Sequence, residues 1–132
     1  MKLKCVIIDD EPLAIDVLKT YIQQSGLLDL EACFTSSVQA LSFLEKNPIE
    51  LVFIDIQMPK LNGLELINGI KNKPKFIITS AFREYALEGF ELDVLDFLVK
   101  PIAYDRFLKS ISKLLNKSIN PLPYGPNSPR FI

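Results

Sequence analysis

The sequence predicts an α/β fold built on one parallel sheet with helices on both faces. Short, nearly continuous apolar runs alternate along the chain with longer stretches in which apolar residues recur at helical spacing. The 132 residues fit one domain, and 48% of them are apolar, which is enough for a core on each face of a sheet. Five such strand–helix units imply a doubly wound, flavodoxin-like (βα)5 domain with strand order 2-1-3-4-5.

The first unit begins with residues 3–8, an apolar run typical of a strand buried on both faces. Pro12 suits the first turn of the next helix, because its fixed φ fits a helix start and its missing N–H has no partner there. Apolar residues then recur at helical spacing up to Gly26, and glycine commonly ends helices.

The other four units follow the same alternation. Their expected strands are residues 30–34, 51–54, 76–79 and 94–99. Their expected helices are one capped by Ser36 or Ser37 and ended by Asn47-Pro48, one opened by Asn62-Gly63, a short one over residues 84–90, and one over residues 104–115.

The last residues differ from the rest in composition. Residues 120–132 hold four of the nine prolines and show no apolar period. Prolines fix φ and remove backbone donors, so this stretch can form neither a helix nor a central strand. We expect a packed domain over residues 1–118 and a Pro-rich linker or tail over residues 119–132, whose final Arg130-Phe131-Ile132 resembles the start of a strand.

Composition excludes several function classes. A net charge of −1 without clustered basic residues gives no basis for binding nucleic acid or a membrane. The apolar run after Met1 is too short for a signal peptide, and no stretch is long enough to span a bilayer, so a cytoplasmic protein is expected. With no histidine, Ser-His-Asp catalysis and histidine-based zinc sites are excluded. Cys5 and Cys33 are expected to be small buried apolar residues rather than a disulfide.

Charged and hydroxyl side chains follow the predicted strands, at the edge of a parallel sheet where ligands bind. These residues are Asp9, Asp10 and Glu11 after the first strand, Asp55 after the third, Thr79 and Ser80 after the fourth, and Lys100 after the fifth. Converging carboxylates repel, and Mg²⁺, which prefers oxygen ligands, relieves that repulsion. A carboxylate beside Mg²⁺ can also act as a nucleophile and form an aspartyl phosphate.

Over residues 3–117 the chain resembles the receiver domains of bacterial response regulators. The resemblance rests on Asp9-Asp10-Glu11, Asp55-Ile56-Gln57-Met58-Pro59, Asn62-Gly63, Ser80-Ala81 and Lys100-Pro101, in this order and at strand ends. It implies a phosphoacceptor switch that catalyses only its own phosphoryl transfer and slow dephosphorylation. In this reading Asp55 accepts the phosphoryl group. Mg²⁺ is held by Asp10, Asp55 and the backbone carbonyl of Gln57, with Asp9 nearby.

The same resemblance assigns the conformational switch. Ser80 is the switch hydroxyl, with Thr79 as the neighbouring candidate, and Ala81 after Ser80 favours the former. Phe97 occupies the position of a rotating aromatic, and Lys100 contacts the phosphate. The Lys100-Pro101 peptide bond is cis in the family.

A narrower similarity points to receivers of the LytTR type, which usually precede a β-rich DNA-binding domain. It rests on residues 80–86, Phe90 and residues 96–101. It implies a sensor histidine kinase as phosphodonor, a possible homodimer on phosphorylation, and control of transcription. DNA would be bound only through a C-terminal domain absent from these residues.

Other interpretations stay open at this point. A flavodoxin-like FMN protein needs a phosphate-binding loop where this chain has acids, whereas a dehalogenase-like phosphatase is weakly matched by Asp9 and Glu11 as Asp-x-Glu. A receiver used only as a binding module is a third alternative. Asp9 and Asp10 could also form a solvated turn, Ser80 a helix cap, and Phe97 simple core.

Overall fold

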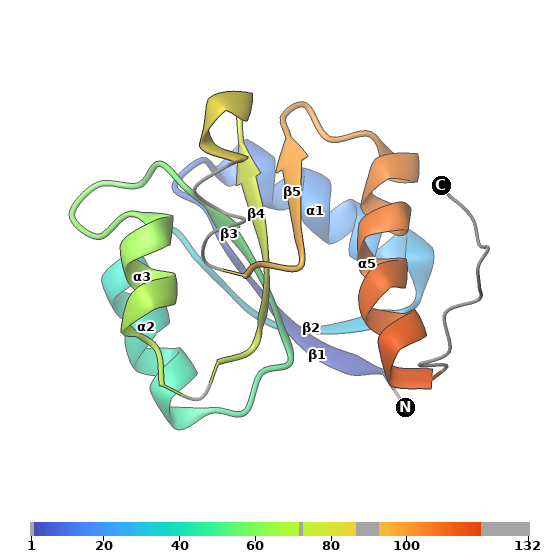
Figure 1. Cartoon of the computed structure of the whole chain (residues 1–132), viewed down its shortest axis with the longest axis horizontal. Helices are drawn as coiled ribbons and strands as arrows, with labels where there is room; N and C mark the ends of the chain where they lie inside the picture. The colour runs from blue at the N-terminus through green and yellow to red at the C-terminus, as the bar shows by residue number, and fades with distance from the viewer. Residues whose placement is uncertain (1, 72, 87–92, 120–132) are drawn as a thin grey trace.

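The sheet of this protein has the predicted strand order, β2-β1-β3-β4-β5, with every neighbouring pair parallel. This is seen in a computed structural model, which describes residues 2–119 except residues 72 and 87–92 (Figure 1). The strands are β1 (Leu3–Ile8), β2 (Leu28–Phe34), β3 (Leu51–Asp55), β4 (Lys75–Ser80) and β5 (Asp96–Val99). The helices are α1 (Pro12–Ser25), α2 (Ser37–Lys46), α3 (Gly63–Gly69), the 3-10 turn η1 (Arg83–Tyr85) and α5 (Tyr104–Ile119). The flavodoxin-like α/β prediction is confirmed.

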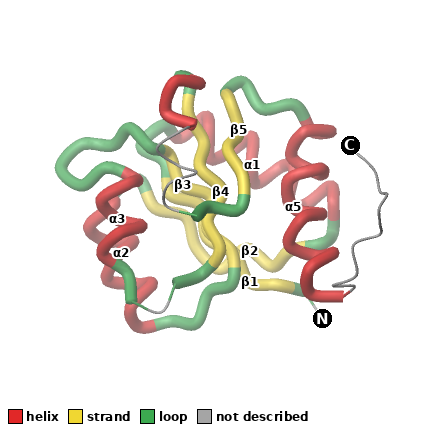
Figure 2. The backbone as a smooth tube through the Cα atoms, in the orientation of Figure 1, coloured by secondary structure: helices red, strands yellow, loops and turns green. Residues whose placement is uncertain are grey.

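Helices cover both faces of the sheet and divide the core into two layers. Figures 1 and 2 show α1 and α5 on one side of the sheet and α2 and α3 on the other. Along β1, Cys5 and Ile7 join the layer under α1 and α5, while Val6 and Ile8 join the layer under α2 and α3. All four side chains are fully buried, which explains why the strand is a continuous apolar run.

The helix ends follow the sequence signals. Gly26 adopts a left-handed conformation with φ of 65° just after α1, and Pro12 starts that helix. Of the two serines considered as a cap for α2, Ser36 is the one whose side chain accepts a hydrogen bond from the Gln39 backbone N–H. Asn62 caps α3 reciprocally with Glu65.

Element boundaries differ from the prediction at several ends. β3 extends one residue further, to Asp55, and β4 extends one residue further at each end, over Lys75–Ser80. β2 starts at Leu28 instead of residue 30, β5 starts at Asp96 instead of residue 94, and α5 continues to Ile119 instead of residue 115. The expected short helix over residues 84–90 is represented by η1, and residues 87–92 lie outside the described part. The tail over residues 120–132 also lies outside it.

Candidate functional site

The predicted site residues meet at one edge of the sheet, where the strands reach their carboxyl ends. Asp55 is the last residue of β3, and β3 pairs with β1 on one side and β4 on the other. Asp9 directly follows β1, Ser80 ends β4 opposite Val99 of β5, and Lys100 follows β5. The strand order therefore brings together residues that are up to 91 positions apart, from Asp9 to Lys100.

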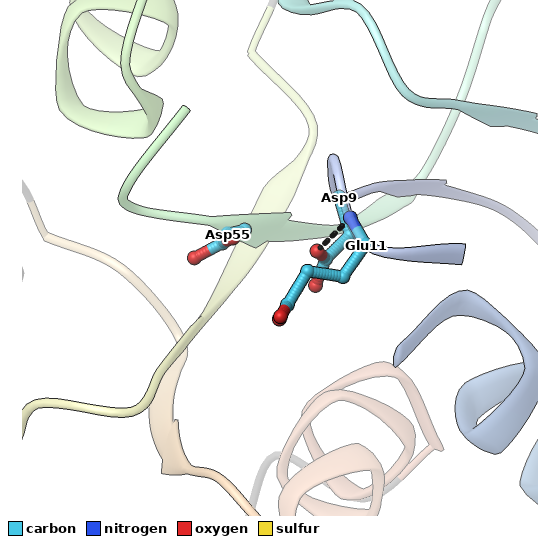
Figure 3. Close-up of side chains that lie close together, drawn as sticks. All are labelled: Asp9, Glu11 and Asp55. Carbon is cyan, nitrogen blue, oxygen red and sulfur yellow. Dashed lines mark hydrogen bonds between the residues drawn. The ribbon is translucent and has the colours of Figure 1, made fainter. Parts of the chain in front are cut away.

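Three carboxylates form the acidic centre of this edge. The carboxylates of Asp9, Glu11 and Asp55 each offer one oxygen, and these oxygens all lie within 4.8 Å of one another. Figure 3 shows the three side chains, with Glu11 reaching past Asp9. Asp9 and Asp55 are 1% and 5% exposed, whereas Glu11 is exposed. The site is thus a buried pair of acids with a third at its solvent side.

Lys100 supplies the opposing charge. Its Nζ lies 2.9 Å from Asp9 Oδ2, 3.2 Å from Glu11 Oε1 and 3.5 Å from Asp55 Oδ2. Burial disfavours the charged ammonium, but the neighbouring Asp9 and Asp55 carboxylates outweigh burial and raise the pKa of Lys100. One cation therefore sits among three acids and does not neutralise them.

The electrostatics act most strongly on Asp55. Burial, followed by the Asp9 charge, raises the pKa of Asp55 to about 6 against the lowering effects of Lys100 and the Gln57 N–H, and Asp10 adds a smaller increase. A carboxylate in this position gains from a nearby divalent cation, which favours its charged form.

Backbone bonds fix the two buried acids. Asp9 Oδ1 accepts a hydrogen bond from the Glu11 N–H at 2.9 Å, drawn in Figure 3. Asp55 Oδ1 accepts one from the Gln57 N–H at 3.2 Å. The loop after β3 is tied down by the Gly63 N–H, which donates to the Ile56 carbonyl at 3.0 Å.

Gly63 matters for a further reason that the sequence did not reveal. A Cβ at this position would lie 2.6 Å from the Asp55 carbonyl oxygen and 2.9 Å from the Ile56 Cα. The start of α3 therefore packs directly on the backbone of Asp55, and only glycine leaves room for that approach.

The remaining predicted residues surround this centre. Ser80 is buried, and its Oγ accepts a hydrogen bond from the Phe82 N–H at 2.9 Å. Phe97 is 7% exposed and packs in the core layer under α2 and α3. Thr79, the alternative hydroxyl, is buried within β4, and the Lys100-Pro101 peptide bond is cis.

Two positions differ from the expected ligand set. The Asp10 side chain is exposed and lies outside the group of three carboxylates, although its charge reaches Asp55. Glu11 is in that group, although it was not among the metal ligands expected from the sequence. Its position in the Asp9-x-Glu11 pattern was the available signal, because the turn after β1 directs both side chains to the same place.

The donor set fits a hard divalent cation. Among the described residues no well-directed hydrogen bond reaches the buried Asp9 Oδ2, and Lys100 approaches that oxygen only as an ion-pair partner. Carboxylate oxygens at this spacing are ligands that Mg²⁺ accepts while keeping several waters.

Two expectations outside this edge of the sheet concern the cysteines and membrane-spanning helices. Cys5 and Cys33 are both free. Cys5 is buried, as predicted, and burial raises its pKa to about 12, whereas Cys33 is only partly buried. In the described part no helix is both long and apolar enough to cross a membrane.

Comparison with known proteins gives consistent results. Residues 5–112 match the model of the family described as response regulator receiver domain. The chain is 30% identical over 98% of its length to transcriptional regulatory protein BtsR of Escherichia coli K12, of which it covers 57%. It is 35% identical over 84% of its length to sensory transduction protein LytT of Bacillus anthracis, of which it covers 46%. The chain thus spans about half the length of the curated relatives it matches.

A solved structure has a similar fold over most of the chain. The response regulatory domain of protein mrkE from Klebsiella pneumoniae superimposes with a TM-score of 0.81 at 30% identity, covering 87% of this chain and 97% of that one.

Proposed function

Since this chain belongs to the response regulator receiver domain family, we propose that Asp55 accepts the phosphoryl group on which two-component signalling depends. The observation that carries this assignment is the position of Asp55: the last residue of the central strand β3, buried, and facing both Asp9 and Lys100. Its relatives of the LytTR type belong to the same signalling class.

The reaction needs a nucleophile, charge neutralisation and a leaving group. A carboxylate oxygen of Asp55 attacks the phosphorus of a phosphorylated histidine on a sensor kinase, forming a P–O bond as the P–N bond breaks. The imidazole leaves with the bonding electron pair and takes up a proton. The Lys100 ammonium, 3.5 Å from Asp55 Oδ2, is placed to pair with the phosphoryl oxygens.

We assign a Mg²⁺ site to the same acids. Asp10, Asp55 and the backbone carbonyl of Gln57 would hold the ion with Asp9 nearby, and the position of Glu11 adds a fourth acid. When bound, Mg²⁺ neutralises the negative charge that accumulates as the phosphoryl group arrives. The cluster of Asp9, Glu11 and Asp55 and the raised pKa of Asp55 support a cation at this edge, whereas Asp10 lies outside that cluster and is assigned on the resemblance alone.

The switch would start at Ser80. In the structure its Oγ accepts the Phe82 N–H, so drawing the hydroxyl towards a phosphoryl group on Asp55 has to break that bond. The space vacated would admit the Phe97 ring from the neighbouring strand, and the segment after β4 would report the change.

The wider role follows from the relatives. We propose that residues 1–118 are the receiver, that residues 119–132 are a linker, and that a DNA-binding domain of the LytTR type follows in the intact regulator. Sensor kinase, cytoplasmic location, homodimer formation on phosphorylation and DNA binding through the downstream domain belong to this proposal. Family membership favours the phosphoacceptor switch over the two enzyme alternatives and the binding module.

The direct test is labelling. Incubation with Mg²⁺ and acetyl phosphate should add one acid-labile phosphoryl group to the wild type, located by mass spectrometry on the peptide holding Asp55. Asp55→Asn should abolish the label, whereas Asp16→Asn, on an exposed position of α1, should retain it. Undiminished labelling of Asp55→Asn would remove Asp55 from this role.

A further inference from the structure

An ion pair between the buried Asp96 carboxylate and the partly exposed Arg106 guanidinium joins the start of β5 to the first turn of α5. Asp96 is 5% exposed, and Arg106 binds both of its carboxylate oxygens, with Nη1–Oδ2 at 2.7 Å and Nη2–Oδ1 at 2.9 Å. Lys113, further along α5, lies 3.2 Å from Asp96 Oδ1. The paired arginine geometry is planar and directional, so it fixes orientation as well as distance.

The same two side chains also hold the backbone of Phe97. The Phe97 N–H donates to Asp96 Oδ1 at 2.8 Å, and Arg106 Nη2 donates to the Phe97 carbonyl at 3.3 Å. Within the described residues β5 is the edge strand of the sheet, so no further strand of that part of the chain lies beyond it to bind these groups. The peptide groups on both sides of one residue are therefore bound by a single ion pair.

The side chain of Phe97 lies in a different layer from the pair that holds its backbone. Its ring packs in the core layer under α2 and α3, whereas Arg106 belongs to α5 on the opposite face. Phe97 is aligned with Ile78 of β4, two residues before Ser80. The backbone is thus restrained from one face of the sheet while the ring meets the other.

We infer that Asp96 and Arg106 are positioning residues for the switch, because they restrain the Phe97 backbone so that a change at Ser80 is expressed as rotation of the ring. This inference rests on the proposed function of Asp55, Ser80 and Phe97. If the edge strand were free to shift, the same change at Ser80 could be absorbed by movement of β5, and the ring position would depend less on the state of Asp55.

The experiment measures the coupling between the state of Asp55 and the position of the Phe97 ring. The nine phenylalanines are replaced biosynthetically by 4-fluorophenylalanine, and the Phe97 resonance is assigned by its loss in Phe97→Leu. Fluorine spectra are recorded without and with saturating Mg²⁺ and beryllofluoride, a stable stand-in for the phosphoryl group on Asp55. The ratio of the ring's two-position equilibrium constants in the two conditions is the coupling.

Arg106→Lys is the informative variant. It keeps a positive charge beside Asp96, but one ammonium cannot bind both carboxylate oxygens and the Phe97 carbonyl in the fixed fork geometry of arginine. We expect the coupling to fall about tenfold, the effect of losing one hydrogen bond to a charged group. Lys113→Gln removes the other cation, which does not touch the Phe97 backbone, and should leave the coupling within about twofold of wild type.

Different outcomes distinguish the positioning role of Asp96 and Arg106 from the proposed function of Asp55, Ser80 and Phe97. Wild-type coupling in Arg106→Lys would overturn the positioning role, as would an equal loss in Lys113→Gln, because that would trace the effect to charge alone. If the Phe97 fluorine resonance of the wild type is unchanged by Mg²⁺ and beryllofluoride, the proposed function is overturned, and the positioning role with it. Thermal stability alone cannot mimic the result, because the coupling compares two states of one folded variant.

Discussion

At Asp55 the carboxylate experiences opposing influences, of which burial is the largest. Burial and Asp9 favour the protonated form, Lys100 and the Gln57 N–H favour the charged form, and the balance leaves the pKa at about 6. An aspartate in the unfolded chain titrates near ~3.9. The folded state therefore holds this proton more tightly than the unfolded state does, which makes stability depend on pH.

This difference predicts that Asp55→Asn is more stable than wild type at neutral pH. Between about pH 4 and 6 the native state binds more protons than the unfolded state, so the wild type loses stability as pH rises through this range, by about 1–3 kcal/mol. An asparagine has no such loss. Thermal unfolding without divalent metal should show the advantage of Asp55→Asn growing from pH 4 to 7.

Asp16→Asn is the matched control, because it makes the same chemical change at an exposed position. A constant difference between Asp55→Asn and wild type across this range would mean that Asp55 titrates normally.

The geometry of the three acids after β1 could not be predicted from the sequence. Three consecutive acids predict an acidic site, but not which carboxylates meet. The hydrogen bond from the Glu11 N–H to Asp9 Oδ1 sets the turn that brings Asp9 and Glu11 together and leaves Asp10 exposed. That geometry depends on the chain direction after the strand, which residue types alone do not specify.

At the scale of elements, α3 packs directly against the backbone of Asp55 at the end of β3. We predict that Gly63→Ala destabilises the domain by about 1–3 kcal/mol, because the new methyl group would meet the Asp55 carbonyl at 2.6 Å and the backbone has to move. Urea unfolding monitored by circular dichroism measures the effect.

Gly69→Ala provides the opposite sign in the same helix. Nothing lies within 4 Å of a Cβ at that position, so alanine should stabilise by up to about 1 kcal/mol. Equal effects of the two substitutions would show that the contact with Asp55 is unimportant.

The connection between β5 and α5 should also be pH-dependent, with the opposite sign to Asp55. Although burial opposes it, Arg106 leads the contacts that lower the pKa of Asp96 to about 2. Its stabilisation is fully present above the unfolded pKa of ~3.9 and is lost as pH falls through about 2. Asp96→Asn should cost about 1–2 kcal/mol at pH 7, a value reduced for the partial exposure of Arg106, and clearly less at pH 2.5.

Urea midpoints for wild type and Asp96→Asn over this pH range test that claim, with the exposed Asp29→Asn as control. A penalty for Asp96→Asn that stays constant down to pH 2.5 would contradict it.

Elements were easier to predict than their ends. Alternating periods located all five strands, yet the start of β5 was placed at residue 94, because the apolar Val94 and Leu95 precede Asp96, where pairing with β4 begins. An aspartate such as Asp96 is unfavourable in a buried strand, and its tolerance there depends on Arg106 in the next helix. The pairing arises from the fold, so local sequence could not reveal it.

For the whole molecule, the strand order was predictable because alternation, chain length and connection handedness leave few topologies. The continuous apolar runs also predicted a core on each face of the sheet. Val6 and Ile7 are adjacent in β1 and lie in different core layers. The role of Gly63 could not be predicted in this way, since it depends on the tertiary approach of α3 to the Asp55 backbone.

Metal addition is the prediction that involves the whole domain. Because the acids converge only in the folded state, Mg²⁺ at 100 times its dissociation constant should stabilise the wild type by about 2.7 kcal/mol, and chelation with EDTA should reverse the gain. Thermal unfolding at pH 7.5 measures it, with NaCl of equal ionic strength as control. A gain that persists in Asp55→Asn with Asp9→Asn would place the ion elsewhere.

The strand order has a consequence for synthesis of the chain. Asp9 is made first and Lys100 some ninety residues later, yet their side chains end 2.9 Å apart. A nascent chain released only as far as β3 holds Asp55, the proposed acceptor, but lacks Ser80 and Lys100. Such parallel pairings between distant segments form late in folding. If Asp55 is the acceptor, as proposed, its phosphorylation would therefore require the completely folded domain. An incompletely synthesised or partly folded chain would not be phosphorylated.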